Sequence, residues 1–411
     1  MRRIGIIGGG ASGMMAAVAA ARSGAQVTIL EKRDRVGKKI LATGNGRCNL
    51  SNRDFCVERD YRSHDIGKLS RYFEQFGVAE TIAFFQDIGM LLTDRNGYLY
   101  PRSMQASAVL DLFLGELDRL SVRIVCECKI SKIEKGKKGF LVSANQGNFS
   151  FDSLILSGGS GAGINGKEGL GVFDLAKDMG LPLYEPLPAL TGLRCGERFF
   201  KALAGVRCMA AITLRIADGN RKKVYEETGE LQLTDYGISG IPVFQFSRYA
   251  SEALYEKRQV EAVINFLPEI AASEWKAFSQ RQYEVCRGKS AGLLGSGILH
   301  KKIVQVLLAE CGLKPGDIVS EDTKKRIFSM FERMRGLKVS VVGSNPMEQS
   351  QVCMGGVSLA RLDENLQAKQ IPGLFLCGEM LDVDGRCGGY NLQWAWSSGF
   401  IAGSAAAKGC P

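Results

Sequence analysis

The 411-residue sequence contains only two histidines, His64 and His300, and no unbroken run of 18 apolar residues. Two isolated histidines argue against a histidine-rich metal site, so we expect no metal. The missing apolar run argues against a membrane-spanning helix. The apolar stretch after Met1 is broken by Gly8-Gly9-Gly10 and has no clear cleavage site. We therefore expect no signal peptide and a cytoplasmic protein.

The sequence also lacks a paired cysteine framework and a concentrated basic segment. Its twelve cysteines are scattered, and Cys126-x-Cys128 is too closely spaced for an ordinary zinc site, so reduced thiols are expected. The net charge is +10, but the basic runs at 135–138, 221–223 and 324–326 are short and far apart. This spread favours solubilising faces over a nucleic-acid groove, and it would also attract an anionic cofactor.

Fifty glycines are present, well above the usual share, and they gather in short clusters. The first cluster, Gly8-Gly9-Gly10-Ala11-Ser12-Gly13, fits the pattern G-x-G-x-x-G between an apolar strand over 3–7 and an alanine-rich helix over 11–23. In such a turn one glycine permits the tight bend, the next lets backbone N–H groups approach a pyrophosphate, and the third allows close helix packing. Glu31 follows a second strand over 26–30 and is placed to accept hydrogen bonds from a ribose. This arrangement predicts a dinucleotide site.

The C-terminal part indicates which dinucleotide binds. An apolar strand over 374–377 leads into Gly378-Glu379, which resembles the second motif of FAD sites, where an acid binds the ribityl chain. Gly388-Gly389-Tyr390-Asn391-Leu392 then opens a small-residue helix over 391–407, whose free N–H groups would stabilise charge on a reduced flavin. NAD needs no such remote element, whereas FAD extends across the sheet. We therefore expect FAD.

The segment 37–52, rich in Gly, Asn and Thr beside Lys and Arg, is the most distinctive part of the chain. Together with the two glycine motifs and Gly-Glu-Met-Leu-Asp-Val-Asp-Gly, it closely resembles the BaiN-like flavoprotein family, whose members are also described as aminoacetone oxidase-like or NAD(P)/FAD-dependent oxidoreductases. The resemblance spans the whole chain and implies noncovalent FAD. The predicted cofactor-binding residues are Gly8, Gly10, Ala11, Ser12, Gly13, Glu31, Lys32, Lys39, Thr43, Gly44, Asn45, Gly46, Arg47, Cys48, Asn49, Gly158, Gly159, Gly378, Glu379, Asp384, Gly389, Tyr390, Asn391 and Leu392.

The resemblance and the periodicity together predict an α/β protein. A split, three-layer Rossmann-like FAD domain would comprise 1–187 and 345–411. A β-barrel-like insert would comprise 188–270 and 336–344, and a helical subdomain 271–335.

The reaction is less closely defined than the cofactor. Flavin carries the redox chemistry, so the protein need only orient the substrate and move a proton. Arg47, Arg386 and Tyr390 are the catalytic candidates. We expect reduction of an activated C=C bond, or its reverse, in a small organic molecule that includes steroid- or bile-acid-like compounds. NAD(P)H would be a transient electron donor, because Gly159-x-Gly161-x-Gly163 has the wrong spacing for a second dinucleotide motif.

Three alternatives stay open at this stage: an oxygen-dependent oxidase of small amines, a tRNA- or nucleic-acid-linked flavoprotein, and a purely structural FAD-binding protein. The lack of a concentrated basic and aromatic groove counts against nucleic acid. The sequence leaves open whether the protein is a monomer or a homodimer.

Overall fold

The computed structural model describes residues 1–163, 171–218 and 221–409. The chain divides into two compact units, Met1–Leu187 with Met347–Pro411, and Pro188–Pro346. Within the described residues, no helix is long and apolar enough to cross a membrane.

The first unit is built on a five-stranded parallel sheet in the order β20-β11-β1-β2-β7. Its strands are β1 (Arg3–Ile7), β2 (Gln26–Leu30), β7 (Arg123–Val125), β11 (Ser153–Leu156) and β20 (Leu374–Leu376). All residues of β11 and β20 are buried, as expected for a parallel sheet that is covered on both faces. Strand β20 pairs with β11 although some 220 positions separate the two strands in the sequence. The sheet is therefore formed by both ends of the chain, as expected for a split domain.

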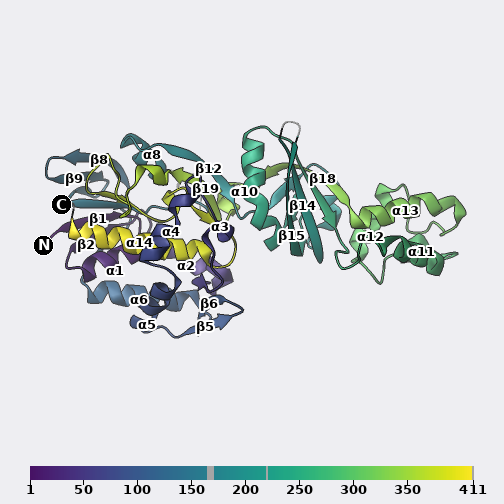
Figure 1. The fold of residues 1–411 in the computed structure, drawn as a ribbon, viewed down its shortest axis with the longest axis horizontal. Coiled ribbons are helices and arrows are strands. Elements are labelled where there is room, and N and C mark those ends of the chain that lie inside the picture. Colours follow the sequence, from purple (N-terminus) through teal and green to yellow (C-terminus); the bar gives the residue numbers. More distant parts are fainter. Residues whose placement is uncertain (164–170, 219–220, 410–411) are drawn as a thin grey trace. The chain divides into compact units, whose positions relative to one another are not determined.

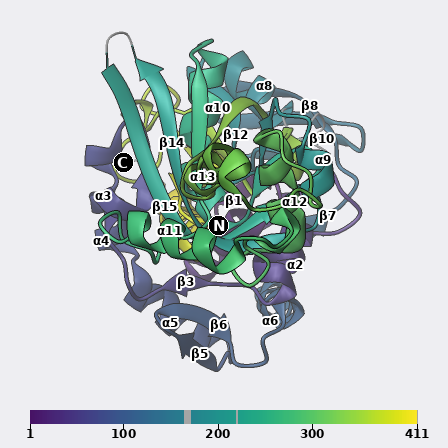
Figure 2. The same ribbon diagram turned by 90° about the vertical axis from the view of Figure 1, so that its right-hand side faces the viewer.

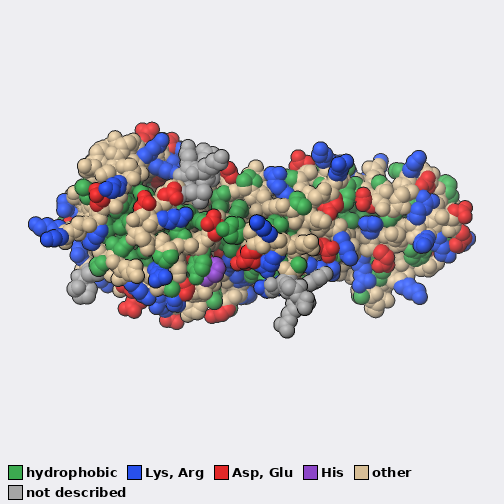
Figure 3. All heavy atoms as spheres, turned by 90° about the horizontal axis from the view of Figure 1, so that it is seen from above, with side chains coloured by type: hydrophobic (Ala, Val, Ile, Leu, Met, Phe, Trp, Pro, Cys, Tyr) green, Lys and Arg blue, Asp and Glu red, His purple; other side chains and the backbone are tan. Residues whose placement is uncertain are grey.

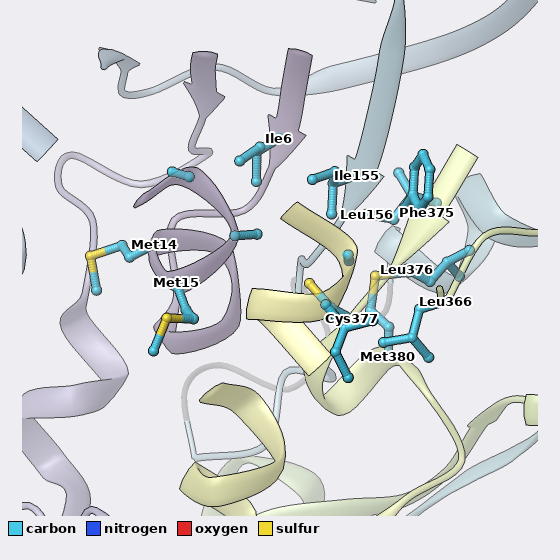
Figure 4. Close-up of a cluster of buried hydrophobic side chains, with 14 of the residues drawn as sticks. Ile6, Met14, Met15, Ile155, Leu156, Leu366, Phe375, Leu376, Cys377 and Met380 are labelled. Carbon is cyan, nitrogen blue, oxygen red and sulfur yellow. The ribbon is translucent and has the colours of Figure 1, made fainter. Parts of the chain in front are cut away.

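Two long helices, α1 (Ala11–Arg22) and α14 (Tyr390–Lys408), lie side by side against this sheet (Figure 1). A Cβ added at Gly399 would lie 2.4 Å from the Ser12 carbonyl oxygen, and one at Gly403 would lie 2.2 Å from that of Ala16. Both residue numbers rise by four in the same direction, so the two helices are parallel and begin at the same end. Figure 4 shows part of the core around them, with buried side chains of the sheet and of the segment 366–380 on one side and Met14 and Met15 of α1 on the other.

A second layer covers the other face of the sheet. It contains the antiparallel sheet β8 (Ile130–Gly136), β9 (Gly139–Ala144) and β10 (Gly147–Phe151), whose Phe151 ring lies against Gly5 of β1. Figure 1 shows β8 and β9 on the opposite side of β1 from α1. The three-layer α/β architecture is therefore confirmed.

The first unit contains further helices and three small sheets. The helices are α2 (Lys38–Ala42), α3 (Val57–Asp60), α4 (Ser70–Gln75), α5 (Val78–Asp87), α6 (Ala106–Arg119) and α8 (Gly171–Asp178). The small sheets pair β3 (Ser51–Asn52) and β5 (Leu92–Arg95) with β6 (Tyr98–Pro101), β4 (Tyr61–Arg62) with β21 (Asp384–Gly385), and β12 (Leu183–Ala189) with β19 (Val352–Val357).

Two stretches whose sequence pattern is continuous are divided in the structure. The apolar run 122–134 resembles one strand in sequence, but it breaks at Glu127, which has a positive φ of 55°. Its first half pairs with β2 as β7, and its second half forms a hairpin with β9 as β8. The helical pattern over 68–90 is also split, because the backbone is extended at Phe76 and Gly77 before α5 begins. The Glu80 carboxylate accepts a hydrogen bond from the Gly77 N–H, which fixes the new helix start.

The second unit contains a closed six-stranded barrel in the order β13-β16-β15-β14-β17-β18. Its strands are β13 (Leu193–Cys195), β14 (Arg207–Asp218), β15 (Arg221–Leu233), β16 (Gly237–Ser239), β17 (Val260–Asn265) and β18 (Leu337–Ser344). The helices are α9 (Phe200–Leu203), α10 (Ile241–Tyr255), α11 (Trp275–Cys286), α12 (Lys301–Glu310) and α13 (Glu321–Arg335). The predicted barrel-like insert and its helices are confirmed. The division of this unit into two domains stays a prediction, because barrel and helices share one compact unit.

Helix α10 was not predicted, and the alternation at 223–226 and 231–234 indicates two strands where the structure has the single strand β15. Figure 2 shows the long β14–β15 hairpin with α10 beside it. A signal for α10 was available: Gly240 ends the preceding strand, Pro242 lies in the first turn, and Val243, Phe246 and Ala250 are buried at helical spacing.

Candidate cofactor site

The first unit encloses a cavity of about 210 Å³ at the end of the central sheet where β1, β2 and β11 terminate. The lining comes from five segments that are distant in sequence. These residues are Gly8 to Ser12, Glu31 to Arg33, Arg35, Gly37 to Ile40, Thr43, Ser157 to Ala162, Gln351, Val352, Glu379, Val383, Asn391, Leu392, Trp394 and Ala395. The carboxyl edge of a parallel sheet is the usual ligand position in α/β folds.

The turn after β1 has the three features that its glycines predict. Gly8 has a φ of +104°, and a Cβ there would lie 2.6 Å from the Ser157 carbonyl oxygen. A Cβ at Gly10 would meet no atom within 4 Å, so the backbone is open toward the cavity. A Cβ at Gly13 would lie 2.0 Å from the Gly8 carbonyl oxygen, so only glycine allows α1 to pack this closely. The turn therefore leaves the first N–H groups of α1 facing an open space.

Glu31 lies at the end of β2, almost fully buried, and lines the same cavity. One carboxylate oxygen accepts the Gly9 N–H at 2.7 Å, and the other accepts the Arg33 N–H at 2.9 Å. These two bonds fix the carboxylate while each oxygen keeps a lone pair for a further donor. The arrangement suits a ribose diol and repels a phosphate.

Glu379, the acid of the C-terminal motif, forms an ion pair with Lys39 of the segment 37–52. Glu379 Oε2 lies 2.6 Å from Lys39 Nζ, and Oε1 accepts the Cys353 N–H at 2.9 Å. Lys39 is on α2 and Cys353 on β19, so one carboxylate joins three segments at the cavity wall. Burial, and the Glu379 charge after it, raise the pKa of the Cys353 thiol well above its usual range, so this neighbour is a neutral thiol.

The segment 43–49 lines the cavity only at Thr43, and the assignment of Gly44 to Asn49 to the cofactor stays a prediction. Asn45 and Cys48 have positive φ, and a Cβ at Gly389 would lie 2.8 Å from Asn49 Oδ1. The loop thus packs directly on the start of α14. Cys48 is fully buried, and this burial raises the pKa of its thiol to about 12.

The three catalytic candidates do not line the cavity. Arg47 is exposed, and the backbone N–H of Arg386 donates to the Asp60 carbonyl at 2.9 Å. The Tyr390 hydroxyl donates to the Asp54 carbonyl at 2.8 Å, and burial raises its pKa to about 12. Asp384 is buried in β21 and is also outside the lining, as are Gly13, Gly378 and Gly389. Their assignment to cofactor or catalysis stays a prediction.

Several lining residues were not predicted. Trp394 and Ala395 are one turn further along α14, and the small residues Ser160 to Ala162 extend the turn after β11. The helical period places residues 391 and 395 on one face, which was a usable signal. Val352 and Val383 carry no chemical signature, and only the fold brings them to the site.

This geometry fits FAD. Two parallel helices, α1 and α14, present their N-termini to one cavity, and each contributes a partial positive charge there. The cradle at Gly10 matches a diphosphate, the fixed Glu31 carboxylate matches a ribose, and Glu379 with Lys39 offers both an acceptor and a donor for a polyol chain.

Comparison with known proteins agrees with the fold and the site. Residues 2–405 match the family model described as HI0933-like protein Rossmann domain. The chain belongs to this family. The resemblance inferred from the glycine motifs is thereby confirmed.

Three individual proteins illustrate the relationship. The chain is 40% identical over 99% of its length to 3-dehydro-bile acid delta(4,6)-reductase of Clostridium scindens, which it covers completely. It is 26% identical to the ribosomal RNA dihydrouridine synthase of Haemophilus influenzae, with 96% of both chains covered. The structure of 3-ketosteroid-delta4-(5alpha)-dehydrogenase from Rhodococcus jostii RHA1 shares the fold, with a TM-score of 0.50, 15% identity, and coverage of 99% of this chain and 97% of that one. The protein is a flavin-dependent oxidoreductase with an FAD-binding Rossmann-like domain.

Proposed function

We propose that the protein uses reduced NAD(P) to reduce a C=C bond conjugated to a carbonyl group in a small, steroid- or bile-acid-like molecule. The observation that carries this proposal is the 40% identity with a named bile-acid reductase along the entire length of both chains. Identity over the whole length includes the second unit as well as the cofactor cavity.

The names of the relatives support the same type of bond. A 3-dehydro, delta(4,6) bile acid has two C=C bonds conjugated to a ketone, and dihydrouridine is uridine whose ring C=C bond, conjugated to a carbonyl, has been saturated. Both changes add a hydride and a proton to an electron-poor alkene. An oxygen-dependent amine oxidase is not favoured, because neither relative's name describes that chemistry.

We assign the cofactor as follows. The N–H groups of Gly10, Ala11 and Ser12 would bind the diphosphate, Glu31 the adenosine ribose, and Lys39 with Glu379 the ribityl chain. The start of α14 at Asn391 and Leu392 would face the pyrimidine ring. FAD, when bound, supplies the hydride-transfer chemistry.

A nucleotide donor such as NAD(P)H would bind transiently. The described residues contain one glycine-rich turn of the dinucleotide type between a strand and a helix, the one after β1. If FAD occupies that turn, the donor must exchange with the substrate at the flavin. This predicts competition between NAD(P) and substrate.

Reduction of uridine in ribosomal RNA is the second candidate, favoured by the 26% relative and by the net charge of +10. Figure 3 shows Lys and Arg interspersed with Asp and Glu over the visible face, with no continuous basic surface on that side. Mixed charge gives weaker non-specific attraction to a phosphate backbone.

The experiment is a direct comparison of substrates. The purified FAD-loaded protein is incubated anaerobically with NADH or NADPH and either a 3-oxo-4,6-diene bile acid, its saturated analogue, or unmodified ribosomal RNA. Products are identified by mass spectrometry. Saturation of the diene acid alone supports the proposal. Dihydrouridine in the RNA without reduction of the bile acid would replace it with the second candidate.

A further inference from the structure

His64, one of the two histidines of the chain, is bound to a buried carboxylate. Its Nδ1 lies 3.0 Å from Asp382 Oδ2, and the same oxygen accepts the His64 backbone N–H at 2.8 Å and the Ser63 hydroxyl at 3.3 Å. Asp382 is fully buried, whereas 39% of the His64 side chain is exposed. The carboxylate of the pair thus lies in the protein interior, whereas the imidazole is partly exposed to solvent.

An aromatic ring fixes the imidazole in a second direction. The rings of His64 and Tyr184 are stacked at 3.7 Å between centroids and inclined by 9°. Tyr184 belongs to β12, which pairs with β19. No described residue binds His64 Nε2, so this nitrogen is available at the exposed edge of the ring.

Asp382, the main support of His64, belongs to a segment that also forms the cofactor cavity. Asp382 directly precedes Val383 and follows Glu379 by three residues, and both of these line the cavity. Its backbone N–H donates to the Val357 carbonyl at 2.9 Å, so it is tied to β19, whose first residue, Val352, is also in the lining. His64 itself is outside the cavity lining, and it is linked to the cavity wall through Asp382, which is bonded to β19.

The carboxylate determines which ring nitrogen carries a fixed proton. Asp382 Oδ2 can only accept, so Nδ1 must donate, and the exchangeable proton of the imidazolium is then on Nε2. We propose that His64 Nε2 supplies the proton that completes reduction of the conjugated C=C bond, and that Asp382 is the residue that positions it. This inference rests on the proposed function.

The step balances. A hydride delivered to the β-carbon forms a C–H bond, and the π electrons of the alkene move toward the carbonyl to give an enolate. The enolate α-carbon then takes the Nε2 proton, which restores the carbonyl and leaves a neutral imidazole. Solvent returns a proton to Nε2, which the exposure of the ring allows. NAD(P)H provides the electron pair through the cofactor.

Other proton donors of the first unit are less suitable. The Tyr390 hydroxyl already donates a hydrogen bond to the Asp54 carbonyl oxygen. The thiols of Cys48 and Cys353 are buried, and burial raises their pKa values. His300, the other histidine, caps α12 in the second unit through Nδ1, which accepts the Lys302 N–H at 3.2 Å. His300 therefore serves as a matched control.

The test compares His64→Gln with His300→Gln, both loaded with FAD. For His64→Gln, reduction of the flavin by NAD(P)H should be unchanged, because no proton enters the substrate in that half-reaction. Reoxidation by the diene acid should slow about 10²-fold, the usual contribution of a general acid. His300→Gln should match wild type in both half-reactions. Equal reoxidation by His64→Gln and wild type would overturn the donor role while leaving the proposed function intact. Failure of wild type itself to be reoxidised by any enone would instead remove the proposed function, and the donor role with it.

A second readout does not depend on turnover. With ¹⁵N-labelled histidine only two side chains contribute, and each is assigned by its Gln variant. In the holoenzyme the neutral His64 ring should carry its proton on Nδ1, and Asp382→Asn should shift the proton toward Nε2. A neutral wild-type ring protonated on Nε2 would overturn the assignment even if His64→Gln were poorly folded.

Discussion

The close parallel contact between α1 and α14 is the feature whose disturbance we expect to be most informative. In Gly403→Ala the new Cβ would lie 2.2 Å from the Ala16 carbonyl oxygen and 2.8 Å from its Cα. An ordinary contact needs roughly 1 Å more, so the helices must separate by about that amount. Overpacking of this kind costs about 1–3 kcal/mol, of which better helix propensity returns about 0.5–1 kcal/mol. A net loss of about 1–2 kcal/mol is expected.

The same shift should weaken cofactor binding, because it displaces one helix start relative to the other at the cavity. We expect FAD affinity to fall about tenfold, which corresponds to about 1.4 kcal/mol. Gly115→Ala in α6 is the matched control, since its Cβ would meet no atom within 4 Å and should stabilise the protein by about 0.5–1 kcal/mol.

The assay is thermal unfolding followed by tryptophan fluorescence, with and without FAD. Trp394 and Trp396 lie on α14 and report on this contact directly. The melting temperature of Gly403→Ala should lie a few degrees below that of Gly115→Ala, with a smaller stabilisation by FAD. Equal melting temperatures and equal FAD affinity in the two variants would refute the close-contact argument.

Three further predictions concern single side chains. Lys39→Met removes the cation paired with Glu379 and should raise the FAD dissociation constant about tenfold by fluorescence titration, whereas Lys177→Met on the exposed face of α8 should not. The hydrogen bonds from Arg119, and after it Arg22, lower the pKa of Glu116 to about 2, so its stabilisation is complete above its ordinary pKa and is lost as the pH falls toward 2. Glu116→Gln should therefore cost about 1–2 kcal/mol in denaturant unfolding at pH 7, and a difference that persists unchanged at pH 3 would contradict this. The exposed Cys56 should react with a maleimide before Cys48, because Cys48 is buried and the pKa of its thiol is raised. Labelling of both cysteines at comparable rates in the native protein would contradict the packing of the loop over 43–49.

The sequence predicted the elements whose physics is local. The turn from Gly8 to Gly13 is determined by residues within six positions, and the strands beside it are short apolar runs, so both were found with their correct bounds. Glu31 was found because its distance from the turn is set by one helix and one strand.

The elements that were missed depend on tertiary contacts. The run over 122–134 contains no glycine or proline, and only pairing with different neighbours divides it at Glu127. The packing of Asn49 on the start of α14 joins residues some 340 positions apart, which no local pattern shows. The His64–Asp382 pair joins residues more than 300 positions apart, and no local pattern could show that a buried carboxylate meets the ring.

The central claim is that this cavity holds FAD for the reduction of a conjugated C=C bond. Stopped-flow absorbance tests it most directly: the protein is first reduced anaerobically with NAD(P)H and then mixed with a 3-oxo-4,6-diene bile acid. We expect NAD(P)H to bleach the flavin band and mixing with the diene acid to restore it fully, with one equivalent of saturated product. A flavin that NAD(P)H leaves oxidised, or that stays reduced in the presence of the diene acid, would contradict it.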